Sequence, residues 1–174
     1  GAFSGLVRLN PDGTRDDTFL FTSASADTIA IEIAPDGKIV LAGRQCPGYC
    51  VRRLNSDGSS DTGFSSYNQL LPITALALLP NGKLAVAGYW GEYFSYIRRL
   101  NADGTFDKDL SGRSVYGLRT QPDGKLIAFG YAGGDASPVV RYNVDGTLDL
   151  TFQSSFNALA VVLTADNKLV AGGN

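Results

Sequence analysis

Short apolar runs alternate with polar turn sequences along the whole chain. Four of these runs lead into a turn that resembles Pro-Asp-Gly, and a second apolar run follows each turn. The four are TIAIEIA (28–34), ITALALL (73–79), VYGLRTQ (115–121) and ALAVVLT (158–164). Their alternation is partial, which is typical of strands buried on both faces. The pattern predicts an all-β chain of short antiparallel strands.

Two phrases recur four times each, at intervals of about 45 residues. The first is RLNPDGTRDDTF (8–19), RLNSDGSSDTGF (53–64), RLNADGTFDKDL (99–110) and RYNVDGTLDLTF (141–152). The second is PDGKIVLAG (35–43), PNGKLAVAG (80–88), PDGKLIAFG (122–130) and ADNKLVAGG (165–173). A period of this length, built of strands and turns, is typical of a propeller or solenoid.

The turn within each phrase predicts a three-residue hairpin loop. In the first copy Pro11 presets φ for a type I turn, and Gly13 suits the left-handed position of the following bulge. In the last copy Asn167 replaces the glycine, and Asn tolerates positive φ better than most residues. We therefore expect two such hairpins in each repeat.

Four strands per repeat in meander order are the anatomy of a propeller blade. We expect a single β-propeller domain over 1–174, with four blades of four antiparallel strands. The blades would be about 28–64, 73–110, 115–152, and 157–174 plus 1–19, so that the N-terminal strands complete the C-terminal blade and close the ring. Alternatives are a sandwich, an excerpt from a longer array, or half of a larger ring completed by a second copy.

The composition restricts the classes of partner that we expect. Hydrophobic residues are 44% and charged residues 18%, as in a globular domain. The net charge is −2 and the cations are dispersed, so we expect no nucleic-acid partner. The apolar runs are too short to span a bilayer, so we expect no membrane insertion.

Two cysteines, Cys46 and Cys50, flank Pro-Gly-Tyr. A disulfide across this short loop is sterically feasible and would place the chain in an oxidising compartment. The alternative is a pair of reduced thiols. A structural zinc site needs four ligands, and two thiols in a chain with no His do not supply them.

An Arg precedes each Asn-x-Asp-Gly turn and an Asp follows it. Counting outwards from the three-residue loop places these residues opposite one another, and such a pair contributes roughly 0.2–1 kcal/mol. The predicted structural pairs are Arg8–Asp16, Arg53–Asp61, Arg99–Asp107 and Arg141–Asp149. A calcium loop is the rival interpretation, but the Arg stands where the first acidic ligand is needed and no bidentate Glu follows. We expect no metal and no cofactor.

Two other recurring positions are interpreted as structural. The turn lysines (Lys38, Lys83, Lys125, Lys168) are expected to be solvated charges at strand starts. Phe19, Phe64, Leu110 and Phe152 are expected to pack between blades.

Both hairpins of a repeat should lie at one end of the strands, which leaves the variable loops at the other end. These loops concentrate aromatic and acidic residues that suit recognition of a glycan or protein. The tentative ligand-binding residues are Tyr49, Tyr89, Trp90, Glu92, Tyr93 and Tyr131. The alternative is that the rings cover the core between blades.

Glu32 and Arg119 share one aligned position of the first and third repeats. In a four-blade ring they would face each other across the axis and plug the channel.

The chain contains no His. This excludes Ser-His-Asp and Cys-His catalysis and the commonest zinc sites. A glycosidase needs two convergent acids, and loop acids such as Asp27, Glu92 and Asp135 have no defined separation. We expect the chain not to be an enzyme.

The alternation of LNxDGTxDxxF with PDGKxxxAG resembles the delta-60 repeat family of bacterial β-propellers, over nearly the whole chain. The resemblance implies a secreted or surface-exposed bacterial protein without established catalytic residues. We therefore expect an extracellular or cell-surface binding module, an adhesin or a domain that recognises carbohydrate or protein. The alternative is a structural spacer or self-assembling unit of a larger surface protein or filament, and a homo-oligomer is compatible with both.

Overall fold

The computed structural model describes residues 6–21, 27–69, 71–90, 94–110, 115–130 and 139–173, and the side chains of all of these except Gln45, Gln69, Trp90 and Phe94. Within this part of the chain the regular secondary structure consists of antiparallel strands. The first sheet has the order β1 (Asp27–Ile33), β2 (Ile39–Cys46), β3 (Gly48–Leu54) and β4 (Tyr67–Gln69). The second has the order β5 (Ile73–Leu78), β6 (Leu84–Trp90), β7 (Phe94–Leu100) and β8 (Phe106–Leu110).

The last two sheets are smaller. The third contains β9 (Gly117–Thr120), β10 (Leu126–Phe129) and β11 (Val140–Tyr142), with β10 in the middle. The fourth pairs β12 (Ala160–Leu163) with β13 (Leu169–Gly172). The expectation of four strands in every blade is therefore wrong. After the turn of the third repeat, the chain makes only an isolated bridge between Tyr142 and Leu148 instead of an outer strand.

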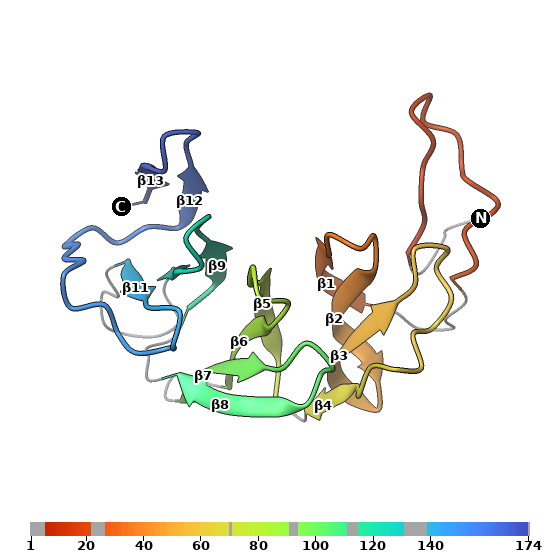
Figure 1. Cartoon of the computed structure of the whole chain (residues 1–174), viewed down its shortest axis with the longest axis horizontal. Coiled ribbons are helices and arrows are strands. Elements are labelled where there is room, and N and C mark those ends of the chain that lie inside the picture. The colour runs from red at the N-terminus through yellow and green to blue at the C-terminus, as the bar shows by residue number, and fades with distance from the viewer. Residues whose placement is uncertain are drawn as a thin grey trace.

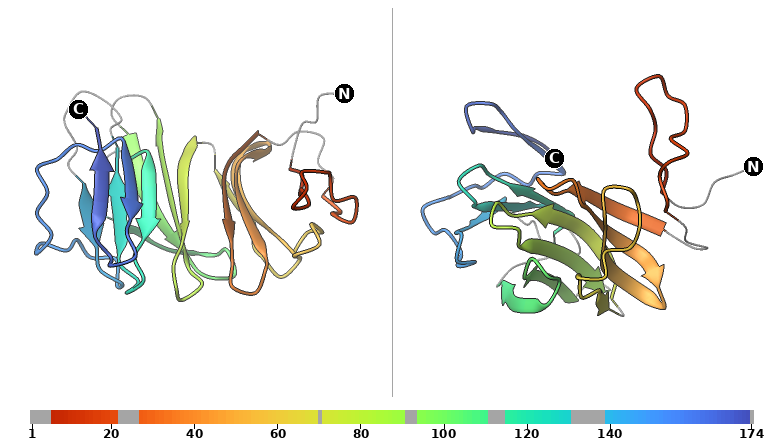
Figure 2. Two further views of the ribbon diagram at one scale, coloured as in Figure 1. Left: turned by 90° about the horizontal axis from the view of Figure 1, so that it is seen from above. Right: turned by 45° about the vertical axis from the view of Figure 1, so that its right-hand side comes forward.

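The sheets stand side by side in an open arc, with β1, β5, β9 and β12 on its inner side (Figure 1). The N-terminal hairpin, whose strands meet at the Leu9–Arg15 bridge, lies at one end of the arc. The pair β12–β13 lies at the other end, and the further views in Figure 2 keep the two ends apart.

The predicted closure of a four-blade ring is therefore wrong: residues 1–19 do not complete the sheet of 157–174. Closure by four blades requires a quarter turn between neighbouring sheets. The rotation here is set by the side chains packed between the sheets, and it is smaller, so four repeats leave the ring open.

The hairpin turns have the predicted geometry. In the N-terminal hairpin the amide of Gly13 donates to the carbonyl of Asn10 at 2.9 Å, and Gly13 has a φ of 83°. Asn167 adopts the same left-handed conformation, with a φ of 65°. The Asp12 carboxylate accepts from the Thr14 amide at 3.0 Å and from its hydroxyl at 2.6 Å. These bonds hold the pKa of Asp12 below its ordinary value.

The core lies between neighbouring sheets. Leu76 of β5 packs against Val40 and Ala42 of β2, which joins the first sheet to the second. Leu118 of β9 packs in the same way against Ala75 and the other small residues of the second sheet. Each sheet therefore turns its large inner-strand side chain toward the preceding sheet and its small ones toward the following sheet.

The structure contains the Arg–Asp pairs, and they are more elaborate than predicted. Asp61 accepts from Arg53 Nε at 2.7 Å and from Lys38 Nζ at 2.8 Å. Lys83 and Lys125 bind the equivalent Asp107 and Asp149 in the same way, together with Arg99 and Arg141. These three turn lysines are thus not merely solvated, as we had expected. In the N-terminal hairpin, Asp16 forms an ion pair with Arg8, whose Nε lies 2.7 Å from the carboxylate oxygen Oδ2.

The same arginines also join each repeat to the next. Arg8 donates to the carbonyl of Ser56 at 2.6 Å, and Arg53 donates to the carbonyl of Ala102, also at 2.6 Å. Arg99 donates in the same way to the carbonyl of Val144, at 2.8 Å. The buried rings of Phe19 and Phe64 lie over the turn glycine of the following repeat, as does Leu110. The three glycines are Gly58, Gly104 and Gly146.

Candidate functional site

The inner side of the arc encloses an open cavity of about 440 Å³. Four strands that are far apart in the sequence line it: β1, β5, β9 and β12. Its middle is walled by small residues at the aligned positions Ala30, Ala75, Gly117 and Ala160. These small residues allow the four inner strands to surround one common space. The volume is within the ~300–1,000 Å³ range of sites for small ligands.

Two charged side chains lie in the cavity near the hairpin end of the strands. Glu32 comes from β1 and Arg119 from β9. Burial raises the pKa of Glu32 above its ordinary value, and attraction to Arg119 opposes that shift. Arg119 donates to the carbonyl of Leu118 at 2.9 Å and lies 5.8 Å from the ring centroid of Phe129. The cavity therefore offers a carboxyl group and a guanidinium cation that interact electrostatically across the space.

An aromatic pair lies at the opposite end of the cavity. Tyr116 lines the cavity and is 45% exposed. Its ring meets that of Tyr89 edge to face, with centroids 5.6 Å apart. Thr74 lies at the aligned position of the neighbouring inner strand and donates to the carbonyl of Val115 at 3.0 Å. This end of the cavity presents an aromatic ring beside polar groups.

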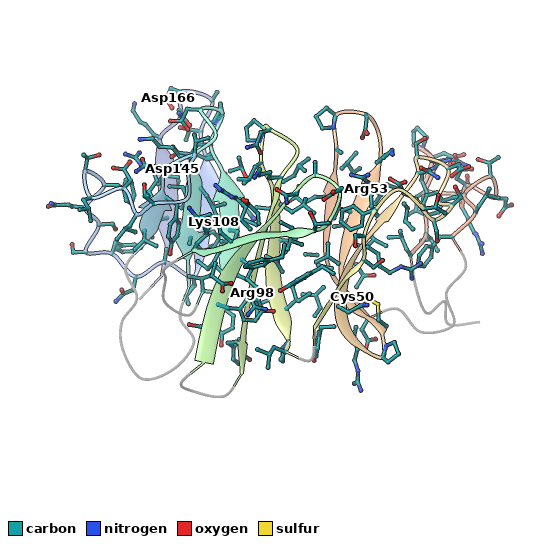
Figure 3. All side chains as sticks on the ribbon, turned by 60° about the horizontal axis from the view of Figure 1, so that its bottom comes forward. Cys50, Arg53, Arg98, Lys108, Asp145 and Asp166 are labelled. Atoms are coloured by element: carbon teal, nitrogen blue, oxygen red, sulfur yellow. A yellow bond between two sulfur atoms is a disulfide. The ribbon has the colours of Figure 1, made fainter. Side chains whose placement is uncertain are left out.

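The two ends of the strands carry different residues in the described part of the chain. Figure 3 shows Arg53, Asp145 and Asp166 toward the hairpin end and Cys50 toward the other end. Tyr49 pairs with Gln69 at the latter end, and Tyr89 pairs there with Ser95. Tyr49 and Tyr89 therefore lie at the same end of their sheets.

Among the tentative ligand-binding residues whose side chains the structure describes, only Tyr89 lies next to the cavity. Tyr49 packs against the core between the first two sheets, which was the alternative interpretation for these rings. Trp90 ends β6, but its side chain is outside the described part. Glu92, Tyr93 and Tyr131 lie outside the described residues.

Tyr116 and Thr74 were missed by the sequence reasoning. The signal was available: both stand six residues before the proline of the following hairpin, directly before the small residues Ala75 and Gly117 of the inner strands. Aligning the repeats on that proline places Thr74 and Tyr116 at equivalent positions.

Cys46 and Cys50 form a disulfide, with Cα atoms 6.2 Å apart. It closes the irregular loop between β2 and β3, where the register shifts between Gly43 and Cys46. A disulfide indicates an oxidising, non-cytoplasmic location. Among the described residues, no helix has the length and apolar character needed to cross a bilayer.

The acids considered for catalysis do not converge in the described part of the chain. Asp27 is exposed at the start of β1, opposite Arg44. Glu92 and Asp135 lie outside the described residues. Within the described ranges no group of three or more His, Cys, Asp or Glu side chains is placed to hold a metal ion.

Repeated antiparallel sheets around a common inner cavity define a β-propeller. The chain belongs to the family described as "Domain of unknown function (DUF5122) beta-propeller", which matches residues 1–19, 34–64, 79–109 and 121–152. The matched segments cover the four copies of the first phrase, apart from Leu110, and the first three copies of the second phrase. No curated protein gives a significant match.

Solved structures share the fold. A protein of unknown function from Bacteroides caccae is 14% identical with a TM-score of 0.60, over 95% of this chain and 61% of its own. A gluconolactonase from Xanthomonas campestris is 16% identical with a TM-score of 0.63, over 95% and 62%. A putative gluconolactonase is 22% identical with a TM-score of 0.53, over 80% and 52%. The chain thus spans about half to three fifths of these structures.

These neighbours overturn the expectation that the chain is not an enzyme. The same fold occurs in a protein described as a gluconolactonase. The absence of His from this chain excludes particular catalytic groups, but it does not separate this fold from enzymes.

Proposed function

We propose that the chain is an extracellular or cell-surface recognition module that binds a carbohydrate-like ligand at the end of the inner cavity formed by Tyr116 and Tyr89. The observation that carries the proposal is the edge-to-face pair of these rings, one of which lines the cavity. The delta-60 repeat family, with its secreted and surface-exposed bacterial proteins, fits this location, as does the disulfide.

The chemistry of the cavity suits such a ligand. A sugar ring has apolar faces and a periphery of hydroxyl groups. The exposed ring of Tyr116 provides a flat apolar surface, while Glu32 and Arg119 provide an acceptor and a donor deeper in the cavity. Because Glu32 and Arg119 influence each other, removing one changes both the charge and the hydrogen-bonding capacity of the site.

A glycan array followed by titration calorimetry tests this function. Tyr116→Ala and Tyr89→Ala should each weaken binding several-fold, since each removes half of the aromatic pair. Phe106→Ala is the matched control, because Phe106 is an exposed aromatic residue of the outer strand β8, away from the cavity lining. Trp90→Ala extends the test to the variable loop. Binding that is insensitive to both tyrosine variants, or no binding across a broad array, would contradict the proposal.

A second candidate is hydrolysis of a sugar lactone, as the description of two neighbours suggests. The observation that favours it is Glu32, a half-buried carboxylate with a raised pKa inside the cavity, which is a property of general bases. A lactonase assay on gluconolactone, with Glu32→Gln as the comparison, separates the two candidates. Turnover lost in Glu32→Gln supports hydrolysis, and the absence of turnover in the unaltered chain excludes it.

A further inference from the structure

The third repeat differs from the other three in the wall of the inner cavity. In the other repeats two small residues face each other across the first two strands of the sheet, as Ala75 and Ala87 do. In the third repeat Gly117 faces Phe129 instead. A Cβ added at Gly117 would overlap the Phe129 ring, so the two replacements depend on each other. Together they place an aromatic ring in the cavity lining.

Arg119 is a second feature of the third repeat that the repeated fold does not require. The equivalent residues of the second and fourth repeats are Ala77 and Val162, so an uncharged side chain is compatible with the same strand pattern. Arg119 lines the cavity, and its guanidinium carbon lies 5.8 Å from the ring centroid of Phe129. The cation therefore lies beside the ring that is specific to this repeat.

Arg119 has no carboxylate at ion-pair distance among the described residues. The arginines of the first phrase do have one, as Arg53 has Asp61 at 2.7 Å. Arg119 donates one hydrogen bond to the carbonyl of Leu118, at 2.9 Å. A guanidinium carries five N–H donors. Arg119 is also exposed, so it retains donors for a ligand in the cavity.

Glu32 limits the kind of anion that Arg119 can take. It lies across the cavity, where its charge interacts with that of Arg119 without direct contact between the two groups. A carboxylate suits the planar fork of a guanidinium, which binds it with two parallel hydrogen bonds. The negative charge of Glu32 repels a doubly charged phosphate about twice as strongly as a singly charged carboxylate. Sugar hydroxyl groups can donate to Glu32, which leaves Arg119 for the anion.

We propose that the ligand of this cavity is an acidic sugar, with its carboxylate bound by Arg119 and a sugar ring against Tyr116. The inference rests on the proposed function, since it names the class of carbohydrate for the same site. Tyr116 directly precedes β9 and Arg119 is the third residue of that strand. Their Cα atoms are therefore about 10 Å apart along the strand, which is close to the length of a disaccharide. A hexuronic acid next to the sugar on Tyr116 would place its carboxylate at Arg119.

Matched pairs of oligosaccharides test the proposal. One member of each pair contains a hexuronic acid, and the other is the same oligosaccharide after reduction of its carboxylates to hydroxymethyl groups. Titration calorimetry should show at least about tenfold tighter binding of the acidic member, as charge-assisted hydrogen bonds imply. Added salt should reduce this preference. Oligosaccharides that carry a hexose 6-phosphate form a third class of probe and should bind more weakly than the hexuronic acids.

Substitutions assign the preference to one side chain. Arg119→Met keeps an unbranched apolar stem and should abolish the preference, with little change in the binding of the reduced member. Arg44→Met is the matched control, because Arg44 is an exposed arginine outside the cavity lining and its replacement changes the net charge equally. Tyr116→Ala should weaken the binding of both members, since both use the ring surface. Thermal unfolding of each variant verifies that it is folded.

The possible results separate this inference from the proposed function. Equal binding of the two members, or a preference that survives Arg119→Met, would overturn the inference and leave the proposed function standing. An equal loss of preference in Arg44→Met, or tighter binding of the hexose 6-phosphates, would also overturn it. Binding of neither member across a broad array would contradict the proposed function and the inference with it.

Discussion

The contacts between repeats can be tested with two glycines that share one backbone conformation. Gly13 and Gly104 occupy the same turn of different repeats, with φ values of 83° and 86°. Alanine at either position meets the same left-handed strain. The two sites differ in their surroundings, because Gly13 is open, whereas Gly104 lies under Phe64 and the carbonyl of Ser65. The pair of substitutions therefore separates backbone strain from packing between repeats.

The expected losses follow from these surroundings. Left-handed strain costs an alanine roughly 1–2 kcal/mol, and Gly13→Ala should lose about that much. In Gly104→Ala the new Cβ would lie 2.7 Å from Phe64 Cζ and would also overlap the backbone oxygen of Ser65. Overpacking of this kind typically costs roughly 1–3 kcal/mol more. The difference between the variants should be about 1–3 kcal/mol, with Gly104→Ala the less stable.

Urea unfolding followed by circular dichroism measures both free energies. The experiment is done at several protein concentrations, so that any association between copies, which would add to the measured stability, is seen as a concentration-dependent midpoint. Each kcal/mol corresponds to roughly 2–4 °C in the melting temperature of a chain of this size, which gives an independent measurement. Equal losses in the two variants would refute the inference that the turn glycines form the joint between repeats.

Three further predictions concern the disulfide and the ion pairs. Replacing Cys46 and Cys50 by Ala should lower the free energy of unfolding by up to about 2 kcal/mol, as the closure entropy of a short loop implies, and chemical denaturation measures it; an unchanged midpoint would contradict this role. The pKa of Asp61 is lowered from 3.8 to about 2 by Lys38 and Arg53, so its contribution to stability should be complete above about pH 4 and lost as the pH falls toward 2. Asp61→Asn should flatten this acid dependence of the unfolding midpoint, and an unchanged acid profile would argue against it. Lys38→Met should destabilise the fold more than Lys168→Met, because Lys38 binds across its sheet to Asp61 whereas Lys168 is exposed beside Asp166; equal midpoints in a thermal unfolding assay would contradict it.

Local chemistry made the hairpins and the Arg–Asp pairs predictable. A type I turn with a bulge is determined by a few adjacent residues, such as Asn10 to Thr14, and the position of Asp16 opposite Arg8 follows by counting. The lysines were misjudged because Lys38 and Asp61 lie in different hairpins of one sheet. Their meeting depends on the order of the strands and the twist of the sheet, which a count within one hairpin does not contain.

Ring closure could not be predicted from the number of repeats. The angle between two sheets depends on the volumes packed between them, such as Leu76 against Val40 and Ala42. The repeated phrases specify each sheet, but these angles determine how many sheets complete a ring. The position of the candidate site also depends on how the sheets are arranged, and the repeated phrases do not specify that arrangement. Tyr116 becomes a cavity residue only because its strand stands on the inner side of the arc.

The open arc is tested most directly by the distance between its ends in one chain. Spin labels on Arg15→Cys and Lys168→Cys, in labelled chains diluted with unlabelled chain so that each signal comes from one molecule, would report this distance by pulsed electron resonance. The open arc predicts a single long separation that is unchanged on dilution. A short separation, as expected for two labels on neighbouring strands of one sheet, would show that a single chain closes on itself. That result would contradict the account.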